Sequence, residues 1–184
     1  MPVNNPGHST RDLNLFVSQV TEGCNSVLEL GCGYGDKLAL CRAPVKIGVD
    51  AHLTYVMQAV ARFGNQAAFF CAVAENFVQH MLPQSVDAIL FIDFIEHLEA
   101  NAAETLIRRC KEIARKKIAA FVPEGHCPLT EDVFKTGGDY WQTHRSDWTR
   151  DWLHNLKFDV AVWENYHVLS YGKRNALLAV WEAI

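Results

Sequence analysis

Short apolar runs alternate with segments of helical periodicity through residues 26–123. The runs are rich in β-branched and aromatic residues, as strands are. Continuous apolar strands separated by helices are typical of a parallel sheet that is buried on both faces, so the pattern predicts an α/β fold. The runs are SVLELG (26–31), VKIGVD (45–50), QAAFFCAV (66–73), VDAILFID (86–93) and KIAAFVP (117–123), and helices are expected near 36–42, 52–63, 75–81 and 101–115, the last with Asn101 as N-cap and Glu104 reaching back.

The end of the chain departs from this alternation. After a helix expected at 147–156, two strand-like runs at 158–169 and 175–184 are separated only by the five residues SYGKR. A parallel return would need a crossover of about a dozen residues or more, so these strands must run antiparallel. The sequence therefore predicts a sheet that closes with a C-terminal hairpin.

Length and composition fit a single domain. The 184 residues are 49% apolar, which is enough for a sizeable core, and no repeat or second composition block interrupts them. We therefore treat residues 1–184 as one domain with an N-terminal appendage at 1–24. The formal net charge of -4 gives no field that attracts polyanions, so nucleic acid is not indicated as a partner.

Neither export nor membrane association is indicated. The N-terminus lacks the charged start and apolar run of a signal peptide, and no stretch reaches about 18 uninterrupted apolar residues. The six cysteines form no CxxC pair, and most lie in apolar or helix-like stretches, as reduced thiols do. We therefore expect a cytoplasmic protein without a membrane span.

A glycine-rich turn, VLELGCGYGD (27–36), contains the end of the first strand. A dinucleotide-binding turn would read GxGxxG and would place pyrophosphate at the start of the next helix. Here Asp36 occupies the position of the third glycine, and a carboxylate there caps the helix and repels phosphate. The turn therefore favours a nucleoside that has no phosphates and carries positive charge, and S-adenosylmethionine has both properties.

Two carboxylates are placed to bind such a ligand. Asp50 ends the second strand, and a parallel βαβ unit brings it beside the tip of the first strand, within reach of ribose hydroxyls. Its alternative role is to cap the helix that starts near His52. Glu29 lies in a mostly apolar strand, and a buried carboxylate needs partners. These are either the amides of the turn or the amino group of the ligand.

Four segments, VLELGCGYG, GVDAHL, AVAENF and FIDFIEHLE, resemble in order and spacing the motifs of class I S-adenosylmethionine-dependent methyltransferases, especially the small bacterial ubiquinone-biosynthesis (type 11) group. The resemblance implies a Rossmann-like α/β/α sandwich with a seven-stranded sheet in the order 3-2-1-4-5-7-6. It also implies methyl transfer to an oxygen or nitrogen of a small molecule or saccharide. The cofactor-binding residues that it implies are Glu29, Gly31, Cys32, Gly33, Gly35, Asp50, Ala51, Ala74, Glu75 and Asp93.

The third motif departs from the family pattern. Where the family has an acidic residue that accepts a hydrogen bond from the adenine amino group, this chain has Val73. The resemblance then leaves the backbone amide of Ala74 to contact the ring, with Glu75 or a neighbouring loop as the acceptor. Glu75 is equally suited to the first turn of a helix.

The fourth strand ends in FIDFIEHLE, where Asp93, Glu96 and His97 follow the apolar run. Open parallel sheets bind ligands at the carboxyl ends of their strands, so these groups are expected to face a cleft. By resemblance His97 is a base, or an acid-x-x-Glu-His run binds a divalent metal with a later histidine, as in small-RNA 2'-O-methyltransferases. Asp93 is shorter than the glutamate of that pattern, so we expect no metal. His97 could also merely satisfy backbone groups.

Residues 123–148 form a long polar segment after the fifth strand. Loops of this length are usually lids or binding segments, so we expect this one, with Tyr140 and Trp141, to cover the substrate. His144 is the histidine of this segment that we expect to act in catalysis, and capping of the next helix is its alternative role.

The expected catalytic residues are His97, His144 and Glu96. Either histidine could deprotonate a hydroxyl acceptor, because the ordinary pKa of histidine lies near neutrality. A nicotinamide-dependent oxidoreductase would need a third glycine and a substrate domain, and the chain has neither. A metal-assisted RNA 2'-O-methyltransferase and a non-catalytic module that binds the cofactor stay open as alternatives.

Overall fold

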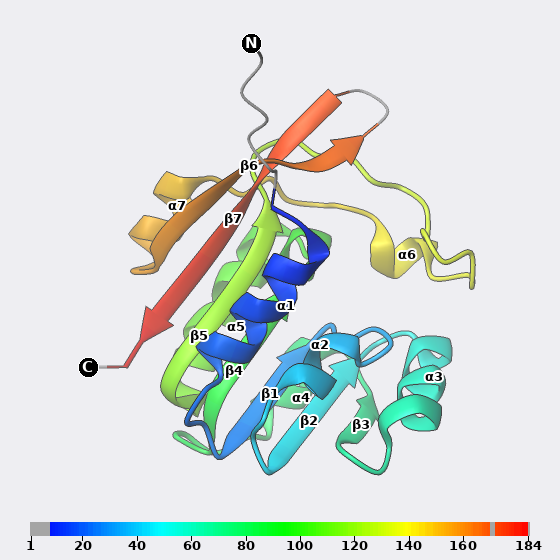
Figure 1. Cartoon of the computed structure of the whole chain (residues 1–184), viewed down its shortest axis with the longest axis vertical. Coiled ribbons are helices and arrows are strands. Elements are labelled where there is room, and N and C mark those ends of the chain that lie inside the picture. The colour runs from blue at the N-terminus through cyan, green and yellow to red at the C-terminus, as the bar shows by residue number, and fades with distance from the viewer. Residues whose placement is uncertain (1–7, 170–171, 184) are drawn as a thin grey trace.

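The computed structural model describes residues 8–169 and 172–183. One seven-stranded sheet has the order β3-β2-β1-β4-β5-β7-β6, with helices on both of its faces (Figure 1). Strands β1 to β5 run parallel, and β7 is antiparallel to both β5 and β6. The predicted α/β class, strand order and C-terminal hairpin are confirmed. The strands are β1 Ser26–Leu30, β2 Val45–Asp50, β3 Ala68–Cys71, β4 Val86–Ile92, β5 Ala114–Pro123, β6 Asp159–Leu169 and β7 Gly172–Glu182.

The helices lie close to their predicted positions, but the predicted start of the longest one is wrong. Helix α5 begins at Ala100 with Glu99 as its N-cap residue. Glu104 accepts a hydrogen bond from the indole Nε1 of Trp152, a distant partner that no local pattern reveals. No helix in the described ranges is both long and apolar enough to cross a membrane. The helices are α1 Thr10–Val20, α2 Asp36–Leu40, α3 Leu53–Phe63, α4 Ala74–Gln79, α5 Ala100–Ile113, α6 Asp139–Gln142 and α7 Arg150–Asn155, with a 3-10 turn η1 at Ile95–His97.

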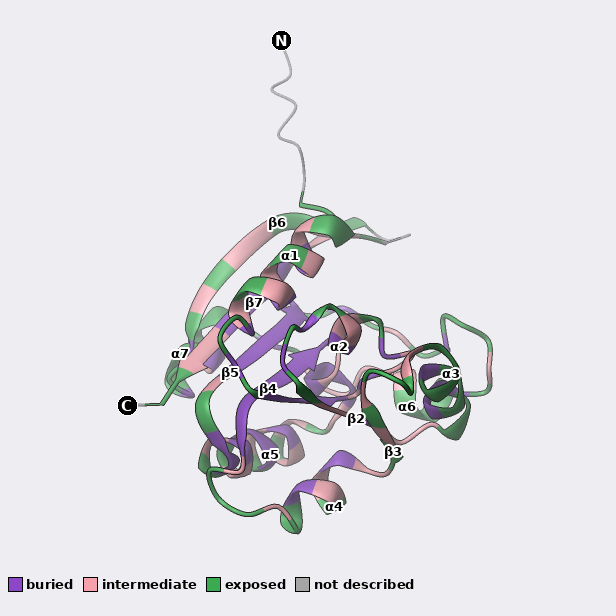
Figure 2. Ribbon diagram, turned by 60° about the horizontal axis from the view of Figure 1, so that its bottom comes forward, coloured by how far each residue is buried: buried purple, intermediate pink, exposed green. Residues whose placement is uncertain are grey.

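Apolar side chains cover both faces of the sheet, and Figure 2 shows the buried strands β4 and β5 at its centre. Helices α4, α5 and α7 pack on one face and α1 and α2 on the other. Residues 1–7 of the predicted appendage at 1–24 lie outside the described residues, and over residues 8–24 the prediction needs correction, because Leu13 and Val17 of α1 are buried in the core. Leu13, Phe16, Val17 and Val20 have the spacing of an amphipathic helix.

The strand register brings the carboxyl ends of three strands to one edge of the sheet. Glu29 of β1 pairs with Gly48 of β2 and with Leu90 of β4. The segments that follow β1, β2 and β4 therefore leave the sheet side by side. They are the glycine turn, the start of α3 and the 3-10 turn η1.

Candidate active site

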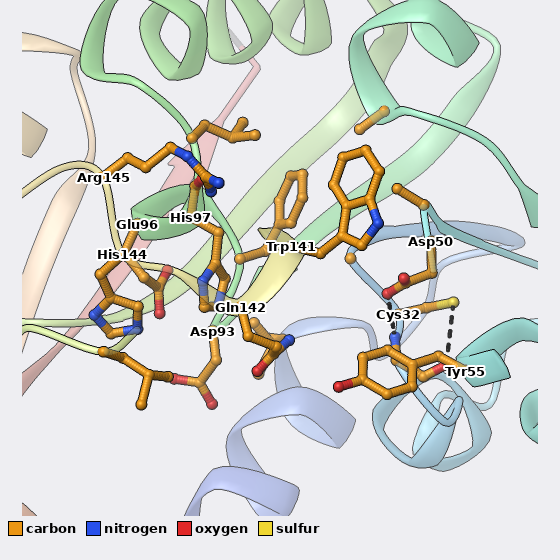
Figure 3. A pocket seen from close by; sticks show the side chains of 18 of the residues that line it. Cys32, Asp50, Tyr55, Asp93, Glu96, His97, Trp141, Gln142, His144 and Arg145 are labelled. Atoms are coloured by element: carbon orange, nitrogen blue, oxygen red, sulfur yellow. Dashed lines mark hydrogen bonds between the residues drawn. The ribbon is translucent and has the colours of Figure 1, made fainter. Parts of the chain in front are cut away.

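A cleft of about 770 Å³ lies at the carboxyl ends of the parallel strands. In Figure 3, Asp50 and Cys32 lie on one side of the view and Glu96, His97 and His144 on the other. All of the predicted site residues except Gly35 line this cleft. Those that do are Glu29, Gly31, Cys32, Gly33, Asp50, Ala51, Ala74, Glu75, Asp93, Glu96, His97 and His144.

The two later glycines of the turn serve different purposes. Gly33 lines the cleft with a φ of 50°, and a Cβ there would meet no protein atom within 4 Å. That open space is available to a ligand. Gly35 instead faces the protein, because a Cβ at its φ of 79° would lie 2.9 Å from the ring of Phe69. Gly35 therefore shapes the turn and does not line the cleft, which corrects its predicted role.

Asp50 fixes both the glycine turn and the start of α3. Its Oδ2 accepts a hydrogen bond from the backbone N–H of Gly33 at 2.8 Å, and its Oδ1 accepts one from His52 at 2.9 Å. Burial raises the pKa of Asp50, while these backbone donors oppose the rise. Each oxygen keeps a second lone pair for a further donor. The capping role and a ligand-binding role are therefore compatible.

Glu29 is a buried carboxylate with an unsatisfied oxygen. Its side chain is 1% exposed, and Oε2 has no hydrogen-bond partner among the residues that the structure describes. Burial raises the pKa of Glu29 to about 8, although the amide of Leu38 opposes the rise. Buried polar atoms without partners are rare in native proteins. Because Glu29 also lines the cleft, this oxygen is suited to a ligand that donates a hydrogen bond.

The turn η1 holds the segment that carries His144. The backbone N–H groups of Arg145 and Ser146 donate to the carbonyl oxygen of Glu96 at 2.8 and 3.1 Å. The guanidinium of Arg145 donates to the carbonyl oxygen of His97 at 2.7 Å. These bonds place the rings of His97 and His144 with their centroids 4.8 Å apart. The acceptors of these hydrogen bonds are backbone carbonyl groups, which every residue type carries. The sequence therefore contains no sign of the role of Arg145.

Glu96, His97 and His144 form an acid-histidine cluster whose ligand atoms lie within 4.8 Å of one another. In the described part of the chain, Glu96 Oε2 and His97 Nδ1 are buried without a hydrogen-bond partner. Burial, and next the carboxylate of Asp93, raise the pKa of Glu96 well above its ordinary value. Burial and the neighbouring His144 lower the pKa of His97 to about 4. His97 is therefore neutral at pH 7, and the unpartnered atoms of Glu96 and His97 are available to bind a ligand or an ion.

His144 has a defined tautomer. Its Nδ1 is hydrogen bonded to the carbonyl oxygen of Cys127, which only accepts, so Nδ1 carries the proton and the lone pair of the neutral ring is on Nε2. Burial lowers the pKa of His144, which favours this neutral form. His144 does not cap the next helix, because Thr149 does so with its side chain, which accepts a hydrogen bond from the N–H of Trp152 at 3.2 Å.

Asp93 lines the cleft but lies outside the acid-histidine cluster. Its φ of 48° is uncommon for a residue other than glycine, and such strain is often found at functional sites. The side chain is open to the cleft, yet the surrounding protein limits its hydration. This loss of hydration raises the pKa of Asp93 to about 7, and the ammonium group of Lys37 opposes the rise.

The buried carboxylate of Asp132 fixes the shape of the long segment after β5. It accepts hydrogen bonds from the hydroxyl of Tyr55 on α3 and from the backbone N–H groups of Phe134, Thr136 and Gly138. Burial alone would raise the pKa of Asp132, but the bonds from Tyr55 and Thr136 outweigh burial and lower it. The segment is thereby attached to the helix that follows Asp50.

Aromatic side chains from this segment reach the cleft. The ring of Phe134 lies 4.7 Å from that of Tyr34 in the glycine turn. Tyr140 and Trp141 of α6 line the cleft, and the guanidinium of Arg145 lies 4.7 Å from the ring centre of Tyr140. The sequence predicted that these two aromatic residues cover the substrate, which stays a prediction, and both line the cleft.

The residues that line the cleft and that the sequence did not single out include Lys37, Tyr166 and His167. Strand β6 shifts its register against β7 between Trp163 and His167, and Asn165 has a φ of 56°. This irregularity lets the consecutive side chains of Tyr166 and His167 both reach the cleft, since bulges redirect side chains. Asn165, a residue type that tolerates positive φ, is the available sequence signal.

Comparisons with known proteins agree with this geometry. Residues 27–117 match the family model of a methyltransferase domain, whereas no curated protein matches the chain. Similar solved structures include a SAM-dependent methyltransferase from Archaeoglobus fulgidus (17% identity, 94% of this chain and 95% of that chain, TM-score 0.65). A second is the methyltransferase domain of bacterial CtHen1, with 18% identity over 94% of this chain and 96% of that chain and a TM-score of 0.63. A third is the N-terminal domain of EvdMO1 in the presence of SAH and D-fucose, with 16% identity over 98% of this chain and 85% of that chain and a TM-score of 0.67.

The sequence match contains the glycine turn, Asp50 and the acid-histidine segment of β4 and η1. The structural likeness extends the shared fold to nearly the whole chain, including the C-terminal hairpin. Residues 27–117 are therefore similar to a methyltransferase domain, and the described chain has the fold of solved SAM-dependent methyltransferases.

Proposed function

We propose that this protein transfers a methyl group from S-adenosylmethionine to an oxygen or nitrogen of a small molecule or saccharide. The observation that carries the proposal is one cleft in which, among the residues that the structure describes, buried polar atoms lack hydrogen-bond partners at two places. Glu29 Oε2 lies beside the glycine turn, and Glu96 Oε2 and His97 Nδ1 lie beyond Asp93. One group of atoms suits a cofactor and the other suits an acceptor.

The residues around the glycine turn fit S-adenosylmethionine. Glu29 Oε2 would accept a hydrogen bond from the α-amino group, and Asp50 would accept from the ribose hydroxyls. The open space at Gly33 allows the ligand to approach the backbone. Ala74 and Glu75, at the start of α4, line the cleft where the adenine ring would lie. The departure at Val73 leaves the backbone of Ala74 as the ring contact.

The chain's own groups then account for the reaction. Bound S-adenosylmethionine would supply a methyl group on a sulfonium, from which a neutral thioether leaves readily. The cleft holds the reactants in line, and Phe94, Leu98 and Trp141 limit access of water. His144 Nε2 accepts the proton of an acceptor hydroxyl, because Nδ1 is occupied by Cys127. His97, with a pKa of about 4, is the weaker base and orients the acceptor.

Calorimetric titration tests this proposal in two steps. S-Adenosylmethionine is expected to bind, and NAD is expected not to bind, because the cleft offers carboxylates where NAD carries phosphates. Saccharides and small hydroxylated or amino compounds are then screened for uptake of a labelled methyl group. Binding of NAD in preference to S-adenosylmethionine would overturn the assignment.

Cofactor binding is expected to release protons below pH 8. The pKa of Glu29 is about 8, so the free carboxyl group is mostly protonated at pH 7, whereas an α-ammonium group favours its ionised form. Affinity should therefore fall as the pH is lowered from 8, by up to about tenfold per unit. Calorimetry at pH 6.5 in buffers of different ionisation enthalpy measures the released protons directly.

The Glu29→Gln variant is the control for this release. This variant should no longer release the proton that titrates near pH 8 when the cofactor binds. Asp93, with a pKa of about 7, should still release its own proton. An affinity that stays constant between pH 6.5 and 9, without proton release, would contradict the role of Glu29.

A second candidate function is metal-assisted methyl transfer to a 2'-hydroxyl group of RNA. The acid-histidine cluster favours it, because one carboxylate and two imidazoles within 4.8 Å suit an ion such as Mn²⁺. From the sequence we expected no metal, because the side chain of Asp93 is short. The acid-histidine cluster, however, does not include Asp93. A bound ion would keep Glu96 ionised and would lower the pKa of a hydroxyl acceptor.

This second candidate predicts that Mn²⁺ raises the melting temperature of the EDTA-treated protein by several degrees. The ion stabilises the folded chain by binding only the folded cluster. The Glu96→Gln variant should lose most of this shift, whereas Glu22→Gln, an exposed site after α1, should retain it. Methyl transfer that proceeds unchanged in EDTA would exclude the metal-assisted reaction and leave His144 as the base.

A further inference from the structure

Lys37 brings a positive charge into the part of the cleft that contains Glu29 and Asp93. It lies in the first turn of α2, lines the cleft and is half-buried. Burial lowers the pKa of Lys37, whereas the charges of Asp93 and Glu29 oppose this change. The ammonium group is thus close enough to both carboxylates to interact with them, while it stays open to a ligand.

Helix α1 holds this ammonium group in place. Lys37 Nζ donates a hydrogen bond to Asn14 Oδ1 at 2.6 Å. Asn14 is fixed by its neighbour Leu13 and by Val17, which are buried in the core. An ammonium group has three donors, and no other hydrogen bond from Nζ is found within the described residues. Because asparagine is neutral, it orients Lys37 without cancelling its charge.

The adjacent carboxylate does not neutralise Lys37 by direct pairing. Asp36 is ion-paired with Arg62 of α3, whose Nη1 donates to Asp36 Oδ2 at 2.8 Å while Nη2 contacts Oδ1. Glu29 is protonated at neutral pH in the free protein, since its pKa is about 8. Asp93 is the strongest opposite charge acting on Lys37, but within the described residues no hydrogen bond or ion pair joins Lys37 Nζ to a carboxylate. The remaining donors of Nζ are therefore available to a negatively charged group of a ligand.

We propose that Lys37, oriented by Asn14, binds the α-carboxylate of the cofactor while Glu29 binds its α-amino group. The inference rests on the proposed function and extends it. A zwitterionic amino-acid group needs a cation and an anion side by side, and Lys37 and Glu29 line the same cleft on either side of the glycine turn in sequence. It also gives α1, which lies outside the matched residues 27–117, a part in cofactor recognition.

The test compares two ligands that differ in the carboxylate. S-Adenosylmethionine carries it, and decarboxylated S-adenosylmethionine does not. In calorimetry at pH 8.5, where Glu29 is mostly ionised, Lys37→Met should weaken binding of the first by roughly 10- to 100-fold. Binding of the second should change by less than about threefold. Lys37→Arg should recover most of the loss, and Lys173→Met, at an exposed position of β7, should bind both ligands as the unchanged protein does.

Asn14→Leu provides a second variant in case Lys37→Met alters the fold. It leaves the charge of Lys37 but removes its hydrogen-bond partner, so we expect a smaller loss, of about 3- to 10-fold, again confined to the carboxylate-bearing ligand. Equal losses for both ligands, or no loss for either, would overturn the inference. If the unchanged protein binds neither ligand, the proposed function itself fails, and that result is distinct from a failure of Lys37 alone.

Discussion

The Asp50→Ala variant is expected to bind S-adenosylhomocysteine about 100-fold more weakly than the unchanged protein. Hydrogen bonds from two ribose hydroxyls to a carboxylate contribute about 3 kcal/mol together, which corresponds to two orders of magnitude in affinity. The variant also leaves the backbone N–H groups of Gly33 and His52 without their acceptor. The glycine turn should then lose its fixed shape. Calorimetry at pH 8.5 measures the change.

The matched control for Asp50 is Asp151→Ala, at an exposed position of α7, which should bind with unchanged affinity. Melting temperatures of both variants separate a local effect from unfolding. An Asp50→Ala protein that remains folded and binds the nucleoside within threefold of the unchanged protein would show that Asp50 only caps α3.

The His144→Ala variant is expected to lose methyl transfer by a factor of about 100 to 10,000, the usual range for removal of a general base. Its affinity for S-adenosylhomocysteine should stay within about twofold, because His144 lies in the acid-histidine cluster, away from Glu29 and Asp50. Single-turnover transfer of a labelled methyl group to an acceptor found in the screen gives the rate.

His126→Ala is the control for His144. His126 belongs to the same segment, is 74% exposed and lies with its Nδ1 3.1 Å from Asp147, so its loss should leave transfer unchanged. If both histidine variants transfer methyl groups at the same rate, His144 is not the base. If His144→Ala loses cofactor binding as strongly as transfer, its role is structural.

The fold was predictable because the central strands are buried on both faces. Every residue of β4 is buried, and a continuous apolar run records such burial directly in the sequence. At the edge of the sheet this signal weakens, and β3 extends only over Ala68–Cys71 instead of 66–73. Strand β5 begins earlier than expected because Ala114 pairs with Val86 of β4, a contact that a local pattern does not contain.

The site was predictable where its residues follow the ends of parallel strands. Asp50, Asp93, Glu96 and His97 all reach the cleft for this reason. The contact of Lys37 with Asn14, and the irregularity that brings His167 to the cleft, depend on elements distant in sequence. The residue types in the sequence do not reveal these two features.

The role predicted for Asp36 needs revision. The sequence suggested that this carboxylate repels phosphate, but its charge is largely balanced by the ion pair with Arg62. The preference for a phosphate-free ligand that we propose is better attributed to Asp50, which lines the cleft and already accepts the hydrogen bond of the Gly33 N–H group. We therefore expect the selectivity to depend on the carboxylate at the end of β2 and not on the start of α2.

A crystal structure of the protein with S-adenosylhomocysteine tests the central claim most directly. We expect the ribose hydroxyls on Asp50, the amino group within hydrogen-bond distance of Glu29 Oε2, and the sulfur atom facing the side of the cleft that carries Glu96, His97 and His144. A ligand found elsewhere, or a cleft that stays empty at saturating ligand while a pyrophosphate compound occupies the turn at Gly33, would contradict the account.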